Sequence, residues 1–518
     1  MSASTEKKNR QAARETGTDK RTLVAAKEAK QKRNSKIKWT IGTIAVILVI
    51  ALVIVLSATP ILYTNTTAIT VNGEKIAPAE MNYYYSTQFY SLANQYGDYA
   101  PLMGLDVRGG TAGLAHQTCP MLPDGGTWKD YFLQAAQDEI LQIRAIEKYA
   151  SDNGIALTEE EIAQVDSSFD GMDQLAKAQG FGSVDKLFAA NYGAGVDTEV
   201  VREASLKAAL ASKVIKQVSE SFEYDDAQLE EYYKSLNGES DVYDYAYYYI
   251  PAGTVETVNA DGETVNEPND DTRAEALEKA EAIVASYNAA KGSDYLENFN
   301  AAVAENVEGS TGNHRTSPAS GLGVYKEWLL DFHKAGDIGI VANADNNGQY
   351  VVMYLDRSDN HYPMAQVRHI LVRAAADEEG NYTDEAKAEA KAKAEDILNE
   401  WQNGDKTEDS FAELANKYSE DPGSNTRGGL YDNVAKGQMV EEFDRFCFEG
   451  HKTGDTGIVY GESGGVPGYH VMYYVGEGEL YSNYIAKNAL LSQDMDNWMV
   501  QVTEGYEAVE GFGLRMVG

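Results

Sequence analysis

The chain has 518 residues, of which 43% are hydrophobic, so it is long enough for about three or four domains with real cores. Its formal net charge is −37, and the charge is split unevenly: residues 1–38 carry a net +8, whereas the remainder carries −45. A field of that sign repels nucleic-acid phosphates, which excludes nucleic acid as the main partner; solubility is the simpler explanation of the acidity.

The N-terminal region predicts a membrane anchor. Residues 1–38 are polar and basic, as expected of a disordered or loosely helical cytoplasmic tail at an anionic membrane surface. Residues 39–62 contain no charge, and a spanning helix needs about 20 apolar residues. Because the basic side chains flank the N-terminal side, the positive-inside rule places residues 63–518 outside the membrane. The alternative is a signal peptide cleaved near Ser57-Ala58, but the long tail and long apolar run favour an uncleaved transmembrane helix.

Residues 63–238 predict a mostly helical domain that opens with a short hairpin. Asn72-Gly73 lies between two short alternating segments, which is a strong signal for a tight hairpin turn. Helices are expected from Pro78 and from Thr127, separated by a Gly- and Pro-rich loop at residues 98–127. Thr158, followed three residues later by a glutamate, forms a capping box that opens a further helix, and helices continue to about Ser221.

Residues 239–360 look like a degenerate copy of the segment that follows, residues 361–480. The helical spacing of apolar residues is the same in both, and the segment from Gly336 to Val341 echoes the segment from Gly454 to Val459. Repetition at this length indicates a duplicated domain. Aligning the last strands places Tyr248 where the second copy has His369, and Val351 where it has His470. The first copy is therefore predicted to fold alike without catalysing, as a spacer or a peptide-binding module.

The second copy carries the most specific motif of the chain. An extended apolar run surrounds His369, an alanine-rich helix follows, and a predicted capping box at Ser410–Glu413 opens a second helix that Asp421-Pro422-Gly423 ends. The remaining parts of the motif are Gly428-Gly429-Leu430, the segment from Gly437 to Phe443, and the closing strand from Gly468 to Tyr473. In this order and spacing the segment resembles a parvulin-type peptidyl-prolyl isomerase domain.

This resemblance implies an α+β multidomain architecture, in which each of the two parvulin-like domains is a small antiparallel sheet covered by helices. The layout of residues 63–238 resembles the N-terminal chaperone region of SurA- and PrsA-type foldases. Residues 481–518 contain an amphipathic helix, and the same resemblance implies that this C-terminal helix packs on the chaperone domain.

Two groups of residues in the second copy form the candidate site. His369, Asp421 and His470 match the polar floor of parvulins, and the resemblance makes them the catalytic residues, with the imidazoles hydrogen-bonded to each other and Asp421 polarising the substrate amide. The resemblance also assigns the proline pocket, which consists of Leu430, Met439 and Phe443. Without the motif, the histidines would be a buried structural network and the apolar residues ordinary core. Isomerisation needs no nucleophile, and neither a metal nor a cofactor is expected.

The sequence thus predicts an extracytoplasmic isomerase and chaperone that acts on unfolded or newly secreted proteins containing X-Pro bonds. The alternative is an ATP-independent holdase whose two parvulin-like domains bind peptides without isomerising them. A homodimer is compatible with the sequence, which leaves the oligomeric state open. Cys119 and Cys447 fit no metal pattern and fall in different predicted domains, so packed thiols are favoured over a disulfide.

Overall fold

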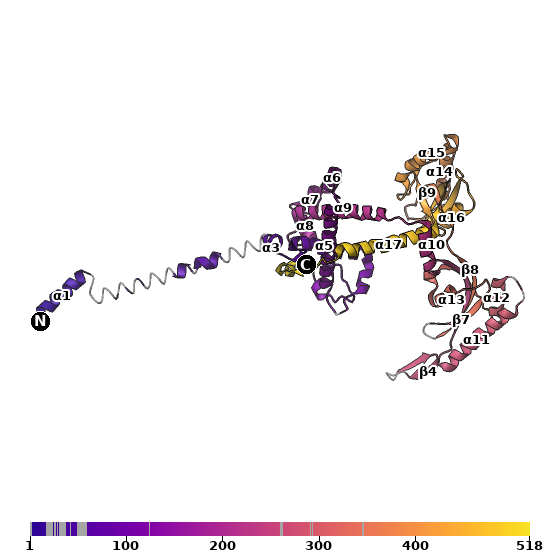
Figure 1. The fold of residues 1–518 in the computed structure, drawn as a ribbon, viewed down its shortest axis with the longest axis horizontal. Helices are drawn as coiled ribbons and strands as arrows, with labels where there is room; N and C mark the ends of the chain where they lie inside the picture. Colours follow the sequence, from indigo (N-terminus) through magenta and orange to yellow (C-terminus); the bar gives the residue numbers. More distant parts are fainter. Residues whose placement is uncertain are drawn as a thin grey trace. The chain divides into compact units, whose positions relative to one another are not determined.

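The computed structural model describes residues 3–16, 24, 27, 30, 38–41, 43–48 and 60–518, apart from residues 124, 259–262, 291, 293 and 344–346. The chain divides into two compact units, which Figure 1 colours along the sequence. Unit 1 comprises Met1–Ser221 and Met495–Gly518, and unit 2 comprises Phe222–Asp494.

Half of the predicted anchor at residues 39–62 lies outside the described residues, because positions 42 and 49–59 are not among them. Within the basic tail, Ala3–Glu15 form helix α1. None of the helices described for this chain is both long enough and apolar enough to cross a membrane.

Unit 1 is mostly helical. Its hairpin joins β1 (Ile69–Val71) to β2 (Glu74–Ile76) through Asn72 and Gly73, both with positive φ (48° and 84°), as the Asn-Gly signal predicts. Capping boxes at Thr127 and Thr158 open the helices that follow them. The helices are α3 (Ile61–Asn65), α4 (Pro78–Tyr96), α5 (Trp128–Asp152), α6 (Glu159–Ser167), α7 (Met172–Ala178), α8 (Val184–Tyr192) and α9 (Thr198–Ser221), with the 3-10 turns η1 (Gly97–Met103) and η2 (Leu114–His116) inside the predicted loop.

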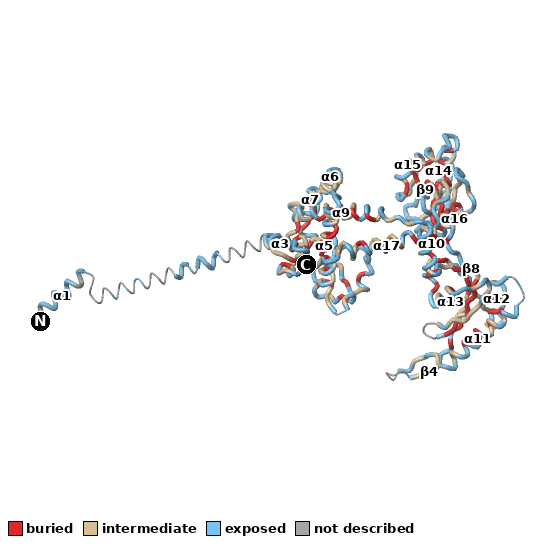
Figure 2. The backbone as a smooth tube through the Cα atoms, viewed as in Figure 1, coloured by how far each residue is buried: buried red, intermediate tan, exposed pale blue. Residues whose placement is uncertain are grey.

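The core of unit 1 lies between α4 and α5. Figure 2 colours the buried residues red. Trp128 and Phe132 stack at a centroid distance of 5.7 Å, and the Phe89 ring meets Phe132 edge-on at the same distance. All three side chains are at most 1% exposed, so aromatic packing joins the two helices.

The C-terminal segment returns to this core. Helix α17 (Tyr481–Thr503) is followed by β13 (Ala508–Glu510), which pairs antiparallel with β1, and by the 3-10 turn η6 (Phe512–Met516). The sheet order is therefore β13-β1-β2. Val517 is fully buried in the same core as Trp128. Segments that precede and follow unit 2 in the sequence thus form one sheet and share one core.

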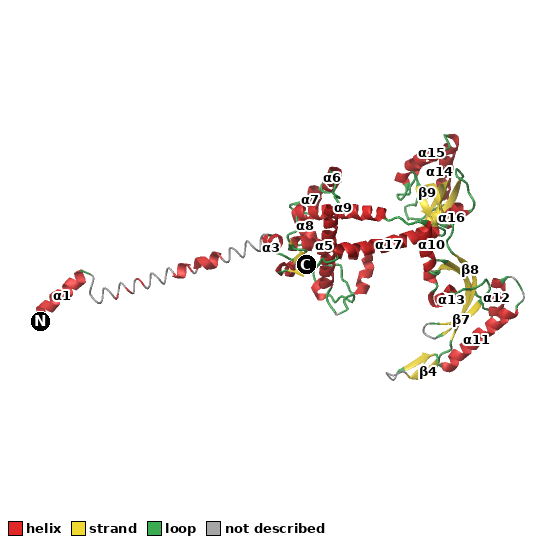
Figure 3. Ribbon diagram, viewed as in Figure 1, coloured by secondary structure: helices red, strands yellow, loops and turns green. Residues whose placement is uncertain are grey.

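Unit 2 contains two four-stranded antiparallel sheets of the same topology, drawn in yellow in Figure 3. The first sheet has the order β6-β3-β8-β7 and the second β10-β9-β12-β11. The strands of the first copy are β3 (Val242–Pro251), β6 (Asn313–Pro318), β7 (Ile338–Ala342) and β8 (Gly348–Ser358), with a separate hairpin of β4 (Val255–Val258) and β5 (Thr264–Glu267). Those of the second copy are β9 (Pro363–Arg373), β10 (Leu430–Val434), β11 (Thr456–Ser463) and β12 (Val466–Leu480). The helices of unit 2 are α10 (Asp226–Ser235), α11 (Asp270–Ala289), α12 (Tyr295–Asn306), α13 (Lys326–Leu330), α14 (Asp384–Asn403), α15 (Glu408–Tyr418) and α16 (Glu441–Phe448), with the 3-10 turns η3 (Ala319–Gly321), η4 (Gly323–Tyr325) and η5 (Asn425–Arg427).

Helices α14 and α15 cover one face of the second sheet. The buried side chains of α14 recur at helical spacing and pack in one cluster with Ile370 and Val471 from the two central strands. The expected capping box at Ser410–Glu413 is wrong by three residues: the N-cap is Thr407, whose side chain accepts from the Ser410 amide, while Ser410 Oγ accepts from the Thr407 amide. Thr407 supplies the same side-chain oxygen one turn earlier, so the helix begins there.

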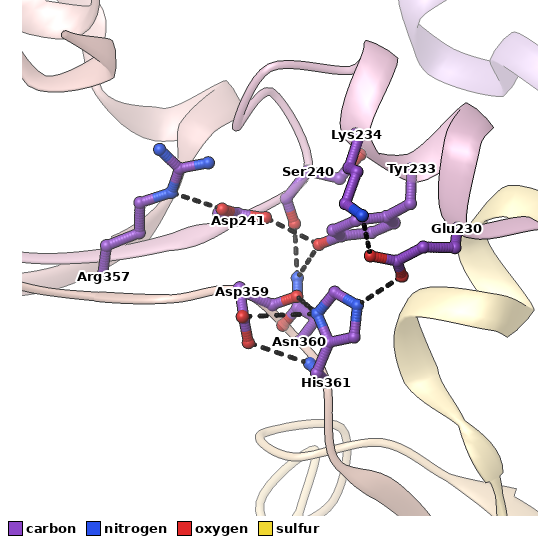
Figure 4. A network of polar contacts seen from close by, with 9 residues as sticks. All are labelled: Glu230, Tyr233, Lys234, Ser240, Asp241, Arg357, Asp359, Asn360 and His361. Atoms are coloured by element: carbon purple, nitrogen blue, oxygen red, sulfur yellow. Dashed lines mark hydrogen bonds and ion pairs between the residues drawn. The ribbon is translucent and has the colours of Figure 1, made fainter. Parts of the chain in front are cut away.

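A polar network ties the junction of the two copies to α10 (Figure 4). Asp241 is 1% exposed, accepts from the Tyr233 hydroxyl at 2.6 Å, and pairs with Arg357 Nε at 2.5 Å. Asn360 is buried with φ 57° and donates to the Ser240 carbonyl at 2.6 Å. The short linker between β8 and β9 is therefore held by satisfied buried groups.

Replacing Val517 by alanine tests whether the C-terminal residues stabilise unit 1. The change leaves a cavity in a fully buried site, and we expect a loss of about 1–3 kcal/mol, measured by hydrogen exchange of the α4 and α5 amides. Val509→Ala is the matched control, because Val509 is 62% exposed on β13, and it should cost less than about 0.5 kcal/mol. Equal protection in both variants would contradict the role of Val517.

Candidate active site

The two histidines meet because β9 pairs with β12. In this register His369 lies opposite Met472 and His470 lies opposite Leu371, so the two imidazoles are diagonal neighbours on one face of the sheet. Their Nδ1 atoms are 3.0 Å apart and the rings stack with centroids 5.2 Å apart at 24°. His369 is only 3% exposed.

Asp421 holds the other side of His369. The loop after α15 places its Oδ2 3.0 Å from His369 Nε2, and the same oxygen accepts from the Ser424 hydroxyl at 2.5 Å and from the Tyr431 hydroxyl at 3.1 Å. Oδ1 accepts from the Gly423 amide at 3.2 Å. The hydrogen bond from His369, followed by those from Ser424 and Gly423, keeps the pKa of Asp421 well below its usual range. Three donors on Oδ2 and one on Oδ1 fix the orientation of Asp421, which also lines the cavity described below.

The protonation pattern of the floor follows from this network. A carboxylate can only accept, so His369 Nε2 carries the proton that faces Asp421. Burial, reinforced by the neighbouring His369, lowers the pKa of His470 to about 3 and keeps it neutral near pH 7. A neutral imidazole carries one N–H, so when Nδ1–H of His470 donates to Nδ1 of His369, Nε2 of His470 is left as an unprotonated acceptor.

A cavity of about 380 Å³ lies above this floor. Met439 and Phe443 line it, as predicted, and the Phe443 ring meets both imidazoles edge-on, at 5.4 Å from His369 and 5.3 Å from His470. Leu430 does not line the cavity, which corrects its assignment to the proline pocket. Successive residues of a strand point to opposite faces, so the next residue, Tyr431, takes the place predicted for Leu430.

Two glycines permit this close packing. A side chain at Gly429, which has φ +70°, would meet the His369 carbonyl oxygen at 2.2 Å. A Cβ at Gly461 on β11 would lie 2.6 Å from Val440 and 3.0 Å from Nε2 of His470. Gly429 lets β10 approach β9, and Gly461 leaves room around the acceptor nitrogen.

Several residues of the site were not predicted. Ser424 is fully buried and 3.1 Å from His369 Nε2, and Tyr431, Gln438 and Arg373 line the cavity. The signal for Arg373 was strand alternation, since positions 369, 371 and 373 share one face of β9. Ser424 and Gln438 lie in loop segments whose side-chain directions no periodicity reveals.

The first copy keeps the fold of the second but not its polar floor, and the sequence alignment of its strands was wrong by one residue. Gly336 donates to the Tyr354 carbonyl as Gly454 donates to the Tyr474 carbonyl, which fixes the equivalent positions of the last strands. The strand registers then place Tyr350 at the position of His470 and Tyr247 at that of His369, instead of Val351 and Tyr248. A slip of one residue moves a side chain to the other face of the sheet.

A third position of the first copy has also become tyrosine. Trp328 stacks on His333 at 4.0 Å, as Phe446 stacks on His451 at 4.1 Å, and the residues three positions before them are Tyr325 and Phe443. Tyrosines therefore occupy the positions of both histidines and of the pocket phenylalanine. The rings of Tyr247, Tyr325 and Tyr350 lie 5.4–6.2 Å from one another.

The cysteines and the acidic residues show no sign of a metal centre. Cys119 and Cys447 are free, buried thiols in separate units, and burial raises the pKa of Cys447 to about 12. Over the part of the chain that the structure describes, no group of three or more His, Cys, Asp or Glu residues could hold a metal ion.

Comparison with known proteins agrees with this geometry. Residues 349–472 match the family described as the PPIC-type PPIase domain. Chaperone SurA of Alkalilimnicola ehrlichii is 33% identical over 124 residues, which cover 23% of this chain and 26% of that protein. Foldase protein PrsA 3 of Bacillus cereus is 31% identical over 150 residues, which cover 29% of this chain and 44% of that protein.

Among solved structures, PrsA from Bacillus subtilis is 15% identical and covers 73% of this chain and 86% of its own, with a TM-score of 0.27. The chain spans less than half the length of the curated relatives that it matches. The resemblance to parvulin-type isomerases and to SurA and PrsA is confirmed.

The low pKa of His470 predicts a specific dependence of stability on pH. The unfolded state accepts a proton near the ordinary histidine pKa of about 6.5, whereas the folded state accepts one only near about 3. Folding therefore loses stability as the pH falls through this window. His470→Gln should remove on the order of 2 kcal/mol of the loss between about pH 7 and pH 5, measured by hydrogen exchange of β9 and β12. The exposed His116→Gln should keep the wild-type slope, and an unchanged slope in His470→Gln would disprove the assignment.

Proposed function

We propose that this chain, which carries a PPIC-type peptidyl-prolyl isomerase domain, is a peptidyl-prolyl cis-trans isomerase joined to a chaperone unit. Its substrates are unfolded or newly secreted proteins with X-Pro bonds. The observation that carries the proposal is the contact between the His369 and His470 imidazoles beneath a cavity lined by Met439 and Phe443.

The chemistry required is modest. Rotation about a peptide bond faces a barrier of about 18–20 kcal/mol, and the twisted amide differs from the planar one because its nitrogen loses conjugation and becomes pyramidal. Phe443 and Met439 hold the pyrrolidine ring by apolar contact, which fixes the substrate without a covalent step. A dry floor of fixed polar groups favours the twisted state more than the planar one.

Each floor residue has a distinct role in this proposal. Asp421, with Ser424 and Tyr431 as donors, fixes the orientation and tautomer of His369. His369 in turn fixes His470 through the contact between their Nδ1 atoms. His470 is then a neutral acceptor whose Nε2 position is set before the substrate arrives.

A holdase that binds peptides without isomerising them is the second candidate. The tyrosines of the first copy favour a non-catalytic role for that domain, because phenol rings cannot reproduce the linked imidazoles. The second copy keeps His369, Asp421, Met439 and Phe443 together, which favours the enzyme.

The proposal includes the location of the chain. A helix at residues 39–62 would anchor it, with the basic tail in the cytoplasm and residues 63–518 outside, where newly secreted chains emerge. A homodimer remains a prediction from the sequence.

A protease-coupled assay on a proline tetrapeptide tests the isomerase. The full chain should accelerate isomerisation. Phe443→Ala should lower kcat/KM by at least about tenfold because it removes the apolar wall, and Asp421→Ala should do so because it releases His369.

The matched control for Phe443→Ala is Tyr325→Ala, which changes the equivalent aromatic residue of the first copy and should leave kcat/KM unchanged. Absence of activity in a folded chain that still suppresses aggregation of an unfolded client would reject the enzyme in favour of the holdase.

The anchor is tested by the size and the extraction of the protein. The chain made in cells should keep its N-terminus by mass spectrometry and stay in the membrane pellet after alkaline washing. Ile47→Arg combined with Leu48→Arg should release it, because each central arginine costs about 2.5–3.5 kcal/mol in a spanning helix. Ile47→Leu combined with Leu48→Ile is the matched control, because it changes the same two positions and keeps the segment apolar, so the protein should stay in the pellet. A mature N-terminus near Thr59 would instead establish a cleaved signal peptide.

A further inference from the structure

Phe512 is a large aromatic side chain displayed on the surface of unit 1. It is 75% exposed and begins the 3-10 turn η6. The glycines on either side of it fix its backbone. The Gly511 amide donates to the Ala68 carbonyl at 2.7 Å, and the Gly513 amide donates to the Thr67 carbonyl at 2.8 Å. Phe512 therefore points outward from a backbone that is tied to the sheet, rather than from a frayed terminus.

This turn adjoins the end of the proposed anchor. Helix α3 begins at Ile61, inside the segment 39–62, and Thr66 follows the helix directly. The Thr66 hydroxyl donates to Sδ of Met516 at 3.7 Å, so η6 lies against the end of α3, and Figure 1 marks the C-terminus beside this helix. Phe512 is thus displayed beside the point at which the chain would leave the bilayer.

Helix α4 separates this end of unit 1 from the opposite end. Pro78, its first residue, lies so close to Gly513 that an added Cβ would be 2.8 Å from Pro78 Cγ. Its last residue leads into η1, which displays Tyr99 at 71% exposed. The 19 residues of α4 span about 28 Å. Of these two exposed aromatic residues, Phe512 lies at the end of α4 where the anchor joins unit 1, and Tyr99 lies at the far end.

We propose that Phe512 inserts into the headgroup region of the lipid bilayer and thereby docks unit 1 on the membrane surface. The inference rests on the proposed anchor and deepens it. Phenylalanine is among the residues with which interfacial segments enter the boundary between headgroups and acyl chains. Arg515 is exposed on the same turn and suits the neighbouring lipid phosphates. Because the chain after residue 38 carries a net −45, the contact depends on the apolar ring rather than on attraction to an anionic surface.

The anchor explains why one ring is sufficient for a lipid surface and insufficient for a second copy of the chain. A tethered group meets its target as an intramolecular event, at an effective concentration far above that of a free protein. A stable protein–protein interface buries about 800 Å² per partner, whereas one aromatic side chain supplies only about 150–250 Å². Docking at Phe512 would direct η1 and the loop that follows it away from the membrane.

The test replaces single residues of the full chain by benzoylphenylalanine, a photo-crosslinking amino acid that keeps an aromatic ring. The chain is placed in phosphatidylcholine vesicles, and adducts are identified by mass spectrometry after illumination. Position 512 should yield lipid adducts, and high salt should not reduce them, because apolar contacts are not screened. Position 99 is the matched control, since Tyr99 is about equally exposed at the other end of α4, and it should yield none. Position 61 reports on the anchor itself.

A second measurement separates the contribution of the ring from mere proximity to the bilayer. With the probe at position 515, Phe512→Ser should lower the yield of lipid adducts by about three- to tenfold, because it removes the apolar group, whereas Phe512→Leu should keep most of it. Since Phe512 is exposed, neither change should destabilise unit 1.

The outcomes distinguish the docking from the anchor. Lipid adducts at position 61 without any at position 512 overturn the docking and leave the anchor in place. Adducts between two copies of the chain at position 512, or equal lipid adducts at positions 512 and 99, also overturn the docking. Absence of adducts at position 61 refutes the anchor, and position 512 then decides the docking by itself: lipid adducts there support it, and their absence overturns it.

Discussion

The antiparallel pairing of β9 with β12 is the constraint on which the site depends. It places two imidazoles from positions 369 and 470 in contact, although about a hundred residues of chain separate them. The opposite face of the same two strands packs Ile370 and Val471 against α14 and α15. Burial of that apolar face fixes the register, because a slip of one residue would turn the histidines into the helical core. Hydrophobic packing on one side of the sheet therefore sets hydrogen-bond geometry on the other.

Comparison of the two copies in unit 2 distinguishes the features that the fold needs from the residues that form the polar floor and the pocket. Both keep the strand order, and in both a glycine amide donates to a tyrosine carbonyl of the last strand. Both also keep the stack of an aromatic ring on a histidine, which is Trp328 on His333 in the first copy and Phe446 on His451 in the second. The positions of the two floor histidines and of the pocket phenylalanine carry tyrosines in the first copy. Since these residues contribute little to the helix-facing core, they can change to tyrosine without loss of the architecture.

Much of this could be predicted from the sequence, and the errors have physical causes. The hairpin at Asn72-Gly73, the helix that starts at Thr127 and the capping box at Thr158 follow from local sequence signals, and the resemblance to parvulins implies the sheets covered by helices. Leu430 was placed in the pocket on the resemblance alone, whereas its neighbour Tyr431 lines the cavity. The strands of the first copy were aligned one residue out of step because apolar runs such as theirs carry little alternation to fix which residues face which way. The three side-chain donors to Asp421 come from a loop and two strands, and no single stretch of sequence contains all three.

The return of the C-terminal residues to unit 1 has a consequence for how the protein is made. β1 emerges from the ribosome early, but its partner β13 and the buried Val517 are synthesised only after unit 2. The helical unit can therefore reach its final sheet only after both copies in unit 2 have been translated. A chain that terminates before β13 would leave an open strand edge on β1 and, without Val517, an unfilled core site. Premature termination would therefore leave unit 1 prone to strand-edge pairing and aggregation.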